Sequence, residues 1–408
     1  MSRSKSEIVV KVVSALSEVD AGQWDACANP WPQTYDPFVS HAFLRALEDA
    51  RCAAPNKGWV PQHLLIEAAD GTLLACAPAY LKSHSRGEYV FDAGWADAYE
   101  RAGGDYYPKL QGAVPFTPVP GRRLLVRPAP DAAEREQHLI AALVELTRRQ
   151  RASSFHITFL SQAEWERAGA VGCLQRTGQQ FHWKNQGYAT FDAFLETFAS
   201  RKRKGVRKER RDAIEPGITI EWLSGADIRQ EHWDAFFKFY LDTGSRKWGT
   251  PYLNRAFFTL LGETMSERCL LVMCKRAGKY IAGALNLIGG DCLYGRYWGA
   301  IEHHPCLHFE VCYYQAIEYA IAHKLDRVEA GAQGEHKLAR GYLPVTTYSA
   351  HWMTDKRLSK AIADYLGRER SYVSQANAEL SAAGPYRKGG ASGSAPPGPP
   401  TAIEDEQD

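Results

Sequence analysis

The sequence of 408 residues lacks the segments that direct a chain into or across a membrane. No uninterrupted apolar run approaches the ~20 residues that span a bilayer. The first twenty residues, MSRSKSEIVVKVVSALSEVD, hold an apolar stretch broken by Lys11 and Ser14, without the long hydrophobic region and cleavage site of a secretory signal. We therefore expect a cytoplasmic protein with no membrane span.

Cysteine pairs and metal-ligand sets are missing as well. The nine cysteines are scattered, odd in number and form no CxxC motif, a pattern typical of buried thiols in a reducing compartment. His303, His304 and His308 lie close together, but no set of Cys or His residues with metal-site spacing accompanies them. The sequence therefore predicts free thiols and no metal.

Neither sign of charge is in excess, since Lys and Arg total 49, Asp and Glu total 47, and the net charge is +2. This balance gives no general reason to expect binding to nucleic acid or to an anionic membrane. A GxSxG elbow, a Walker loop, an HExxH motif and cysteine-nucleophile signatures are also absent, which weakens hydrolase and NTPase interpretations. Any basic site must be local.

The chain is long enough for two domains with sizeable cores, and 45% of its residues are hydrophobic. The stretch 88–127 is rich in Gly, Pro and aromatic residues, and so long an irregular segment usually lines a site. The other elements expected in the first half are a strand at 8–13, helices around Trp24 and at 40–47, a hairpin within 61–84 that turns at Asp70-Gly71, short strands at 89–91 and 124–127, a helix at 131–149, a strand at 154–160 and a helix at 161–168.

The second half repeats this order of elements, which suggests an ancient duplication. Its expected elements are a strand at 180–187, a basic helix, a strand at 218–223, helices within 230–265, a hairpin across Ala277-Gly278, a strand at 293–300, a helix at 310–324 and a strand at 327–332. We predict an α/β (α+β) protein with an N-terminal domain at 1–179, a C-terminal domain at 180–380 and a disordered Gly/Pro/Ala-rich tail at 381–408.

The densest charge lies in SRKRKGVRKERRD, residues 200–212. Cations around a whole helix exceed what solubility needs, and Arg and Lys are the usual partners of phosphate. No aromatic residue interleaves, so phosphate contact is favoured over base stacking; a solvated helix face is the alternative. The candidate phosphate-binding residues, for a nucleotide, coenzyme A or a tRNA acceptor end, are Arg201, Arg203, Lys204, Arg207, Lys208 and Arg211.

The segment LHFEVCYYQAIEYAI, residues 307–321, has the apolar spacing of a helix with one buried face. Glu310 lies in its first turns, where the helix dipole favours a carboxylate or a bound anion. Glu310 is therefore either a structural carboxylate or a general base. His308 and Tyr313, from the same turns, are candidates for contacting substrate.

The segment EAGAQGEHKLARGYLPV, residues 329–345, follows a predicted strand. Glycines let the backbone approach a ligand, and His336 is the residue type whose ordinary pKa lies nearest neutrality. Polar loops at strand ends are where α/β folds keep function. We expect His336 as general base, Glu335 as a second choice beside Glu310, and Lys337 and Arg340 at the substrate.

Other candidates for lining a site are less specific, because an aromatic, amide or charged side chain can equally be a core residue with one satisfied hydrogen bond. They are Trp183 and Asn185 in FHWKNQG, Asp242, Arg246 and Trp248 in FYLDTGSRKWGTPYL, and Tyr107 and Lys109 in DYYPKLQG.

Five segments resemble the FemAB-like family of predicted N-acyltransferases, also described as peptidoglycan biosynthesis/recognition proteins. They are FDAGWADAY, DYYPKLQGAVPFTPV, FHWKN, the LHFEVCYYQAIEYAI helix and EAGAQGEHKLARGYLPV, and the resemblance runs from about residue 20 to 380. It implies two GNAT-type domains in tandem, each a mixed sheet flanked by helices. The basic stretch also resembles the Arg/Lys-rich helix that opens the second domain of Fem-type proteins.

The resemblance implies transfer of an acyl or aminoacyl group from acyl-CoA or aminoacyl-tRNA to a small-molecule or peptide amine, such as a peptidoglycan precursor. RYWGAI, residues 296–301, departs from the GNAT pyrophosphate loop Q/R-x-x-G-x-G/A at its last position, and the coiled-coil hairpin of some Fem-type proteins is absent, so the donor stays open. A non-catalytic module that binds an anionic or cell-wall ligand, and an RNA-binding protein that uses the basic run, are the alternatives. Neither the oligomeric state nor the catalytic half follows from the sequence.

Overall fold

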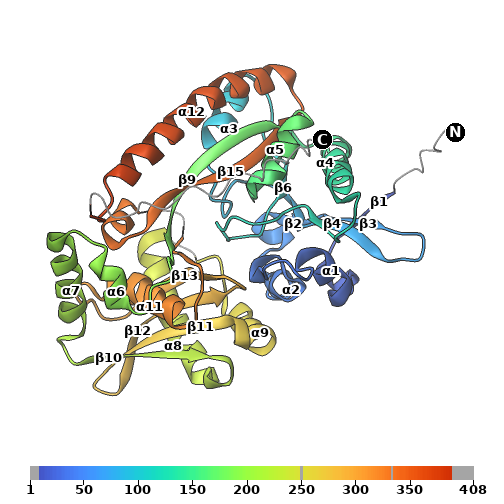
Figure 1. Ribbon diagram of the computed structural model, residues 1–408. Helices are drawn as coiled ribbons and strands as arrows, with labels where there is room; N and C mark the ends of the chain where they lie inside the picture. The colour runs from blue at the N-terminus through green and yellow to red at the C-terminus, as the bar shows by residue number, and fades with distance from the viewer. Residues whose placement is uncertain (1–8, 249–250, 332–333, 388–408) are drawn as a thin grey trace, which may run out of the picture.

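The computed structural model describes residues 9–248, 251–331 and 334–387, apart from the side chains of 245–248. Its main feature is one continuous sheet of 11 strands that runs through both halves, in the order β10-β11-β12-β13-β14-β9-β15-β8-β6-β5-β2. A second sheet of four strands, β1-β3-β4-β7, belongs to the N-terminal half. Helices cover these sheets (Figure 1).

The N-terminal half contains the helices and the hairpin that the sequence predicts. Two helices begin at polar caps: Asp20 accepts from the Gln23 N–H, and Ser40 accepts from the Phe43 N–H. The elements are β1 (Val10–Val13), α1 (Ala21–Ala28), α2 (His41–Asp49), β2 (Trp59–Pro61), β3 (His63–Glu67), β4 (Leu73–Ala77), β5 (Ala79–Lys82), α3 (Ala93–Arg101), β6 (Lys109–Gly112), β7 (Leu125–Val126), α4 (Ala132–Arg149), β8 (Ser154–Leu160) and α5 (Gln162–Ala170).

The C-terminal half repeats the order of helices, hairpin, strand, helix and strand. Its elements are β9 (Leu174–Lys184), α6 (Phe191–Glu196), α7 (Ser200–Ile214), β10 (Ile218–Ser224), α8 (Gln230–Trp248), α9 (Arg255–Met265), β11 (Cys269–Arg276), β12 (Lys279–Ile288), β13 (Cys292–Ala300), α10 (Leu307–Phe309), a π-helical turn (Glu310–Tyr314), α11 (Gln315–Ala322), β14 (Arg327–Glu329), β15 (Leu343–Met353) and α12 (Lys356–Ala382).

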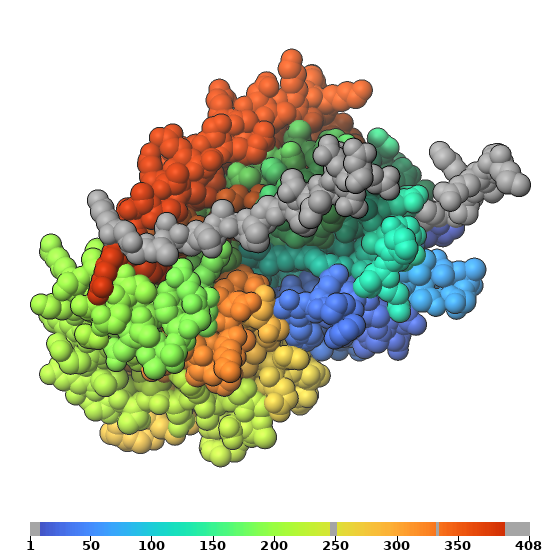
Figure 2. All heavy atoms as spheres, viewed as in Figure 1, coloured from blue at the N-terminus to red at the C-terminus, as the bar shows by residue number. Residues whose placement is uncertain are grey.

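The two halves exchange strands at the centre of the large sheet. β15 pairs antiparallel with β9 along Leu343–His351 and with β8 along Tyr348–Met353, so the last strand of the chain returns to the N-terminal half. Helix α12 then lies across β9 and β15 (Figure 1), and its orange-red atoms form part of the surface in Figure 2. Residues 179 and 180, where the sequence analysis divides the domains, both lie inside β9.

A shared apolar core also joins the halves. Phe43 of α2 packs edge-on against Phe257 of α9, with ring centroids 5.8 Å apart. Phe38 meets Tyr294 of β13 in the same way at 5.1 Å. Burial of large aromatic side chains contributes strongly to folding, so this core fixes one half against the other.

Several expectations differ from the structure, among them the strand expected at 327–332, which ends at Glu329. Residues 89–91 are not a strand, and Tyr89 has a φ of 59°, outside the extended region. The strand expected at 180–187 starts earlier and ends at Lys184. Within the expected disordered tail, residues 381–382 end α12 and 383–387 pack on the C-terminal half, where Tyr386 donates to the Gly341 carbonyl at 2.7 Å; residues 388–408 lie outside the described part.

Gly299 of β13 lies directly under α8. A Cβ atom at this position would be 2.2 Å from the carbonyl carbon of Phe239. We expect Gly299→Ala to lower the free energy of unfolding by about 1–3 kcal/mol, because helix and strand must move apart. Urea denaturation measures the change. Gly367→Ala in α12, where a Cβ has open space, is the matched control and should not destabilise the protein; equal effects at both positions would contradict this packing.

Candidate functional site

The sheet opens in the C-terminal half. β13 and β14 run parallel and pair over only three positions, Cys292–Tyr294 with Arg327–Glu329. β13 then continues to Ala300 paired with β12 alone among the described strands. Residues 295–298 are half-buried. Among the described strands, the edge of β13 beyond Tyr294 therefore has no partner on the side of β14, and we refer to this unpaired edge as the sheet opening.

The N-terminal half contains the equivalent parallel pair, but its opening is filled. β6 and β8 pair over Leu110–Gly112 and Phe155–Ile157. The next residues, 113–119, are all buried. Phe116 in this segment stacks on Tyr252 at 4.8 Å, and its carbonyl accepts from Arg296 Nη2 at 2.8 Å. The segment 113–119 thus packs against the C-terminal half, where it contacts Arg296 on β13.

His336 and Tyr313 meet near the opening. The Tyr313 hydroxyl lies 2.8 Å from His336 Nε2. Tyr313 comes from the π-helical turn, and such turns often occur at functional sites. Gly334, at a φ of +120°, lets the chain turn so tightly that a Cβ there would lie 2.4 Å from the His336 ring. The side chain of His336 is exposed, whereas Tyr313 is buried.

Two other predicted residues surround this pair. The His308 ring lies edge-on to Tyr313, with centroids 5.5 Å apart, and 6.4 Å from the His336 ring. Arg340 lies over the Phe309 ring at 3.4 Å, donates to the His336 carbonyl at 2.7 Å and bonds Glu209. The structure therefore brings together His308, Tyr313, His336 and Arg340, which are far apart in the sequence.

Two further ionisable groups lie at the end of β14. Burial raises the pKa of Glu329 to about 7, although the positive charge of Arg327 acts to lower it. Glu329 Oε2 has no hydrogen-bond partner among the described residues. His182 Nε2 lies 3.7 Å from that oxygen. Lys337 is buried, which lowers its pKa to about 8, and its Nζ donates to the Gly331 carbonyl. A carboxyl and an amine with pKa values near neutrality can each exchange a proton at physiological pH.

Glu310 and Glu335 take different places. Glu310 is buried, accepts two hydrogen bonds from Arg210 at 2.8 and 3.0 Å, and accepts a third from Gln315 at 2.7 Å. These bonds anchor α7 to the π-helical turn. Glu335 is exposed and has no hydrogen bond or ion pair within the described ranges. The sequence named both as second choices for the base, and the structure holds Glu310 in hydrogen bonds to Arg210 and Gln315.

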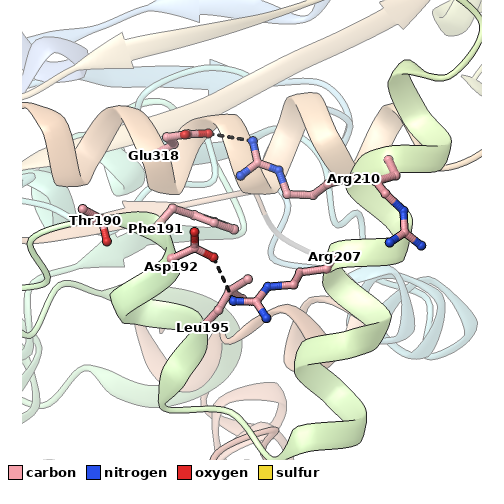
Figure 3. A pocket seen from close by; sticks show the side chains of 8 residues that line it. Thr190, Phe191, Asp192, Leu195, Arg207, Arg210 and Glu318 are labelled. Atoms are coloured by element: carbon pink, nitrogen blue, oxygen red, sulfur yellow. Dashed lines mark hydrogen bonds and ion pairs between the residues drawn. The ribbon is translucent and has the colours of Figure 1, made fainter.

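The basic run forms helix α7 as predicted, and a pocket of about 430 Å³ lies between α6, α7 and α11. In Figure 3, Arg207 and Arg210 extend from α7 to Asp192 and Glu318, with hydrogen bonds of 3.1 and 2.7 Å. Arg203 bonds Glu196. Five cations make no such contact in the described part of the chain and remain available to an anion: Arg201, Lys202, Lys204, Lys208 and Arg211.

The less specific candidates are spread over the fold. Trp183 is fully buried in β9, and Asn185 closes a turn by accepting from the Tyr188 N–H. Tyr107 meets Ser85, and Lys109 is buried in the N-terminal half. Asp242, Arg246 and Trp248 lie on α8, with the last two side chains outside the described residues.

Sequence reasoning missed a buried cluster around Lys109. Its ammonium group contacts Glu88 at 2.6 Å and also Asp92, and Lys82 lies 3.4 Å from Glu88. All four residues are at most 4% exposed. The sequence signal for this cluster was the presence of charged residues within 88–127, a segment rich in Gly, Pro and aromatic residues. The partners of these charges come from separate strands.

Over the described ranges, no three His, Cys, Asp or Glu side chains converge as a metal site would require. The described helices include none whose length and apolar content suit a bilayer crossing. All nine cysteines are free thiols, seven of them buried. RYWGA, residues 296–300, lies in β13 and forms no loop.

The structure consists of two mixed α/β units with the same order of elements, joined by exchanged strands. Each unit contains one short parallel pair of strands. This is a tandem GNAT-like fold. The chain belongs to the FemAB-like family, described as peptidoglycan biosynthesis/recognition, whose sequence model matches residues 15–388. This confirms the resemblance seen in the five segments.

Solved structures support the fold. The chain is similar to FemX at 13% identity and a TM-score of 0.53, covering 85% of this chain and 98% of that one. It is also similar to the C-terminal domain of a protein provisionally assigned as a lysylphosphatidylglycerol synthetase from Agrobacterium fabrum, at 9% identity and a TM-score of 0.51, covering 87% and 97%. Comparison with the curated proteins gives no match.

Proposed function

We propose that the protein is an N-acyltransferase that moves an acyl or aminoacyl group to an amine, and that transfer takes place at the opening between β13 and β14. The observation that carries the proposal is the hydrogen bond between the exposed His336 and the buried Tyr313, in the same half of the molecule as this unpaired edge and as Glu329. In this reaction the amine must lose a proton, and a positioned base contributes a factor of about 10² to 10⁴.

In the proposed reaction His336 accepts the proton of the acceptor amine while Tyr313 holds the imidazole in place. The amine nitrogen attacks the activated carbonyl, and the bond from the carbonyl carbon to the donor sulfur or oxygen breaks. The leaving group takes the proton from His336 and departs as a thiol or as the terminal hydroxyl of a tRNA. His308, Lys337 and Arg340 would position the substrates or stabilise the carbonyl oxygen. Glu335 remains a second candidate for the base, whereas Glu310 would act by holding Arg210.

The proposed donors are acyl-CoA and aminoacyl-tRNA, and both carry phosphates that the unpaired cations of α7 can contact. The proposed acceptor is a small-molecule or peptide amine. The family description supports a peptidoglycan precursor. A cytoplasmic location, where both donors occur, is part of the same proposal.

A transfer assay tests the proposal. The purified chain would be incubated with acetyl-CoA or with tRNA charged with labelled amino acids, together with a panel that includes a muramyl peptide carrying a free amine. Mass spectrometry should detect an acylated amine that forms only with protein present. If a donor or acceptor binds but no combination gives product, the protein is the non-catalytic binding module instead.

Charge removal on α7 should weaken binding of a phosphate-bearing donor. Lys208→Ala with Arg211→Ala removes two cations without a partner in the described structure. For charged tRNA we expect the slope of log K against log salt to fall by about 1.4–1.8, because each phosphate contact contributes about 0.7–0.9. Filter binding at several salt concentrations measures it. Arg149→Ala with Lys360→Ala, exposed residues of α4 and α12, is the control of equal charge; the same loss in both variants would contradict a site on α7.

The raised pKa of Glu329 predicts a pH-dependent stability difference. The folded protein holds this proton more tightly than the unfolded chain, where glutamate titrates near 4.3. Stability is therefore lost as pH rises from about 4.5 to 7. From pH 5 to pH 8, Glu329→Gln should gain as much as about 3 kcal/mol relative to the unaltered protein. Urea unfolding at both pH values measures the gain. Glu335→Gln, at an exposed position, should show none, and a pH-independent difference for Glu329→Gln would contradict the assigned burial.

A further inference from the structure

A second pocket, of about 270 Å³, is lined by residues of β9, β15 and α12 together with Tyr89, Val90, Phe91 and Phe159 of the N-terminal half. Its floor is formed by Gly178 of β9 and by Thr347 and Ser349 of β15, and Phe159 and Val373 line its sides. A Cβ at Gly178 would lie 2.8 Å from Thr347 Oγ1. The absence of a side chain at this position keeps the floor open.

The pocket is mostly apolar and carries no uncompensated charge. Arg176, the one lining cation, forms a two-pronged ion pair with Glu369 at 2.7 and 2.8 Å. The remaining lining groups are aromatic rings, valine side chains, hydroxyls and amides. Such a pocket suits a small uncharged group that carries a hydrogen-bonding carbonyl.

Ser349 stands at the end of a buried chain of hydrogen bonds. Its Oγ lies 3.0 Å from His351 Nε2, and His351 Nδ1 lies 2.7 Å from His156 Nδ1. His156 Nε2 lies 2.8 Å from Ser154 Oγ and 3.9 Å from Asp92 Oδ2. Ser349 and His351 are two apart on β15, so their side chains share one face of the sheet.

The positions of the protons follow from these distances. Burial lowers the pKa of both imidazoles, that of His156 to about 3, so both rings are neutral at pH 7. Only one of the two facing Nδ1 atoms can carry a proton. The charge of Asp92 favours the proton of His156 on Nε2, which leaves its Nδ1 to accept from His351. His351 Nε2 is then an acceptor and receives the Ser349 hydroxyl proton.

We propose that Ser349 is a second nucleophile, with His351 as its base and His156 as a positioning residue, and that it is acylated by activated esters of short uncharged acyl groups. A nucleophile bonded to a base that a third group orients is the arrangement needed for covalent catalysis. Ser349 Oγ forms a bond to the acyl carbon as its proton passes to His351 Nε2. The bond between acyl carbon and ester oxygen breaks, and the leaving alcohol takes that proton.

Acetylation by p-nitrophenyl acetate tests this assignment. The full chain is treated at pH 7.5, and the modified residues are mapped by peptide mass spectrometry over time. We expect one acetyl group on Ser349. This mapping on the unaltered protein needs no variant, and absence of acetyl-Ser349 from the folded chain overturns the proposal.

Variants then show whether Ser349 reacts because His351 activates it or only because its hydroxyl is exposed to the ester. His351→Gln keeps a polar partner but removes the base, and should slow acetylation of Ser349 by about 10² to 10⁴-fold. Gly178→Val fills the pocket and should also block it, while Ser371→Ala on the exposed face of α12 should change nothing. Acetylation of Ser349 at an unchanged rate in His351→Gln overturns the role of the base. His336→Gln should be acetylated normally, which separates this site from the proposed transfer site.

Discussion

Transfer to the acceptor amine is expected to fall by about 10² to 10⁴-fold when His336 is replaced by glutamine. Glutamine can still bond the Tyr313 hydroxyl, which lies 2.8 Å from His336 Nε2, but it cannot take up a proton. Because His336 is exposed and outside the apolar cores, the melting temperature should stay within a few degrees of the original. The initial rate of product formation measures the effect.

His138→Gln on α4 is the matched control, since it makes the same chemical change in the other half of the molecule. This variant should retain full activity. Tyr313→Phe should lose less activity than His336→Gln, because it removes the group that orients the ring and leaves the base. If His336→Gln transfers the group at an unchanged rate, His336 is not the base. Glu329 and Glu335 are then the next residues to test.

The largest effect on stability is expected from Lys109→Met. The ammonium group of Lys109 lies between the carboxylates of Glu88 and Asp92, and all three are buried. Breaking a buried ion pair by removing one partner leaves an uncompensated charge, which costs about 3–5 kcal/mol. Urea denaturation at pH 7 should show a loss of this size.

The same change at an exposed lysine provides the control. Lys360→Met on α12 should alter the free energy of unfolding by less than about 0.5 kcal/mol. If Lys109→Met proves as stable as Lys360→Met, Glu88 and Asp92 must take up protons without penalty. In that case the cluster is not held together by its charges.

Local patterns gave most of the elements but not their long-range partners. The apolar spacing of 307–321 and the cation density of 200–212 both predicted real helices. The contacts that α7 makes with the rest of the fold could not be predicted from local patterns. Arg210 bonds Glu310, a residue one hundred positions further on, and no local signal distinguishes Arg210 from Arg211, which makes no such contact in the described part.

Local patterns also could not predict that β15 pairs with strands of both halves. β15 has one row of partners in β9 and another in β8, and pairing between strands so far apart in sequence depends on the whole fold. The Gly, Pro and aromatic content of 88–127 did indicate an important segment. It could not show that Glu88, Asp92 and Lys109 are buried together, because burial of a charge depends on partners that other strands supply.

Polar residues after a strand end were predicted to form a site, and this stays a prediction. His336 and Arg340 come from one such loop, and His308 and Tyr313 from the entry of one helix, and the structure brings these segments into contact. Glu329 was visible in the same loop sequence. Burial at the end of β14 raises the pKa of Glu329. The sequence around a single charged residue does not predict whether that residue is buried.

Hydrogen exchange with and without donor tests the central claim most directly. The unaltered protein would be exchanged alone and with saturating acetyl-CoA or charged tRNA, and protection would be mapped by mass spectrometry. Binding at the proposed site predicts slower exchange over residues 295–300 of β13, in the turn at Glu310–Tyr314 and at Glu335–Arg340. Protection confined to the N-terminal half, or no protection with either donor, would contradict the placement of the transfer site in the C-terminal half.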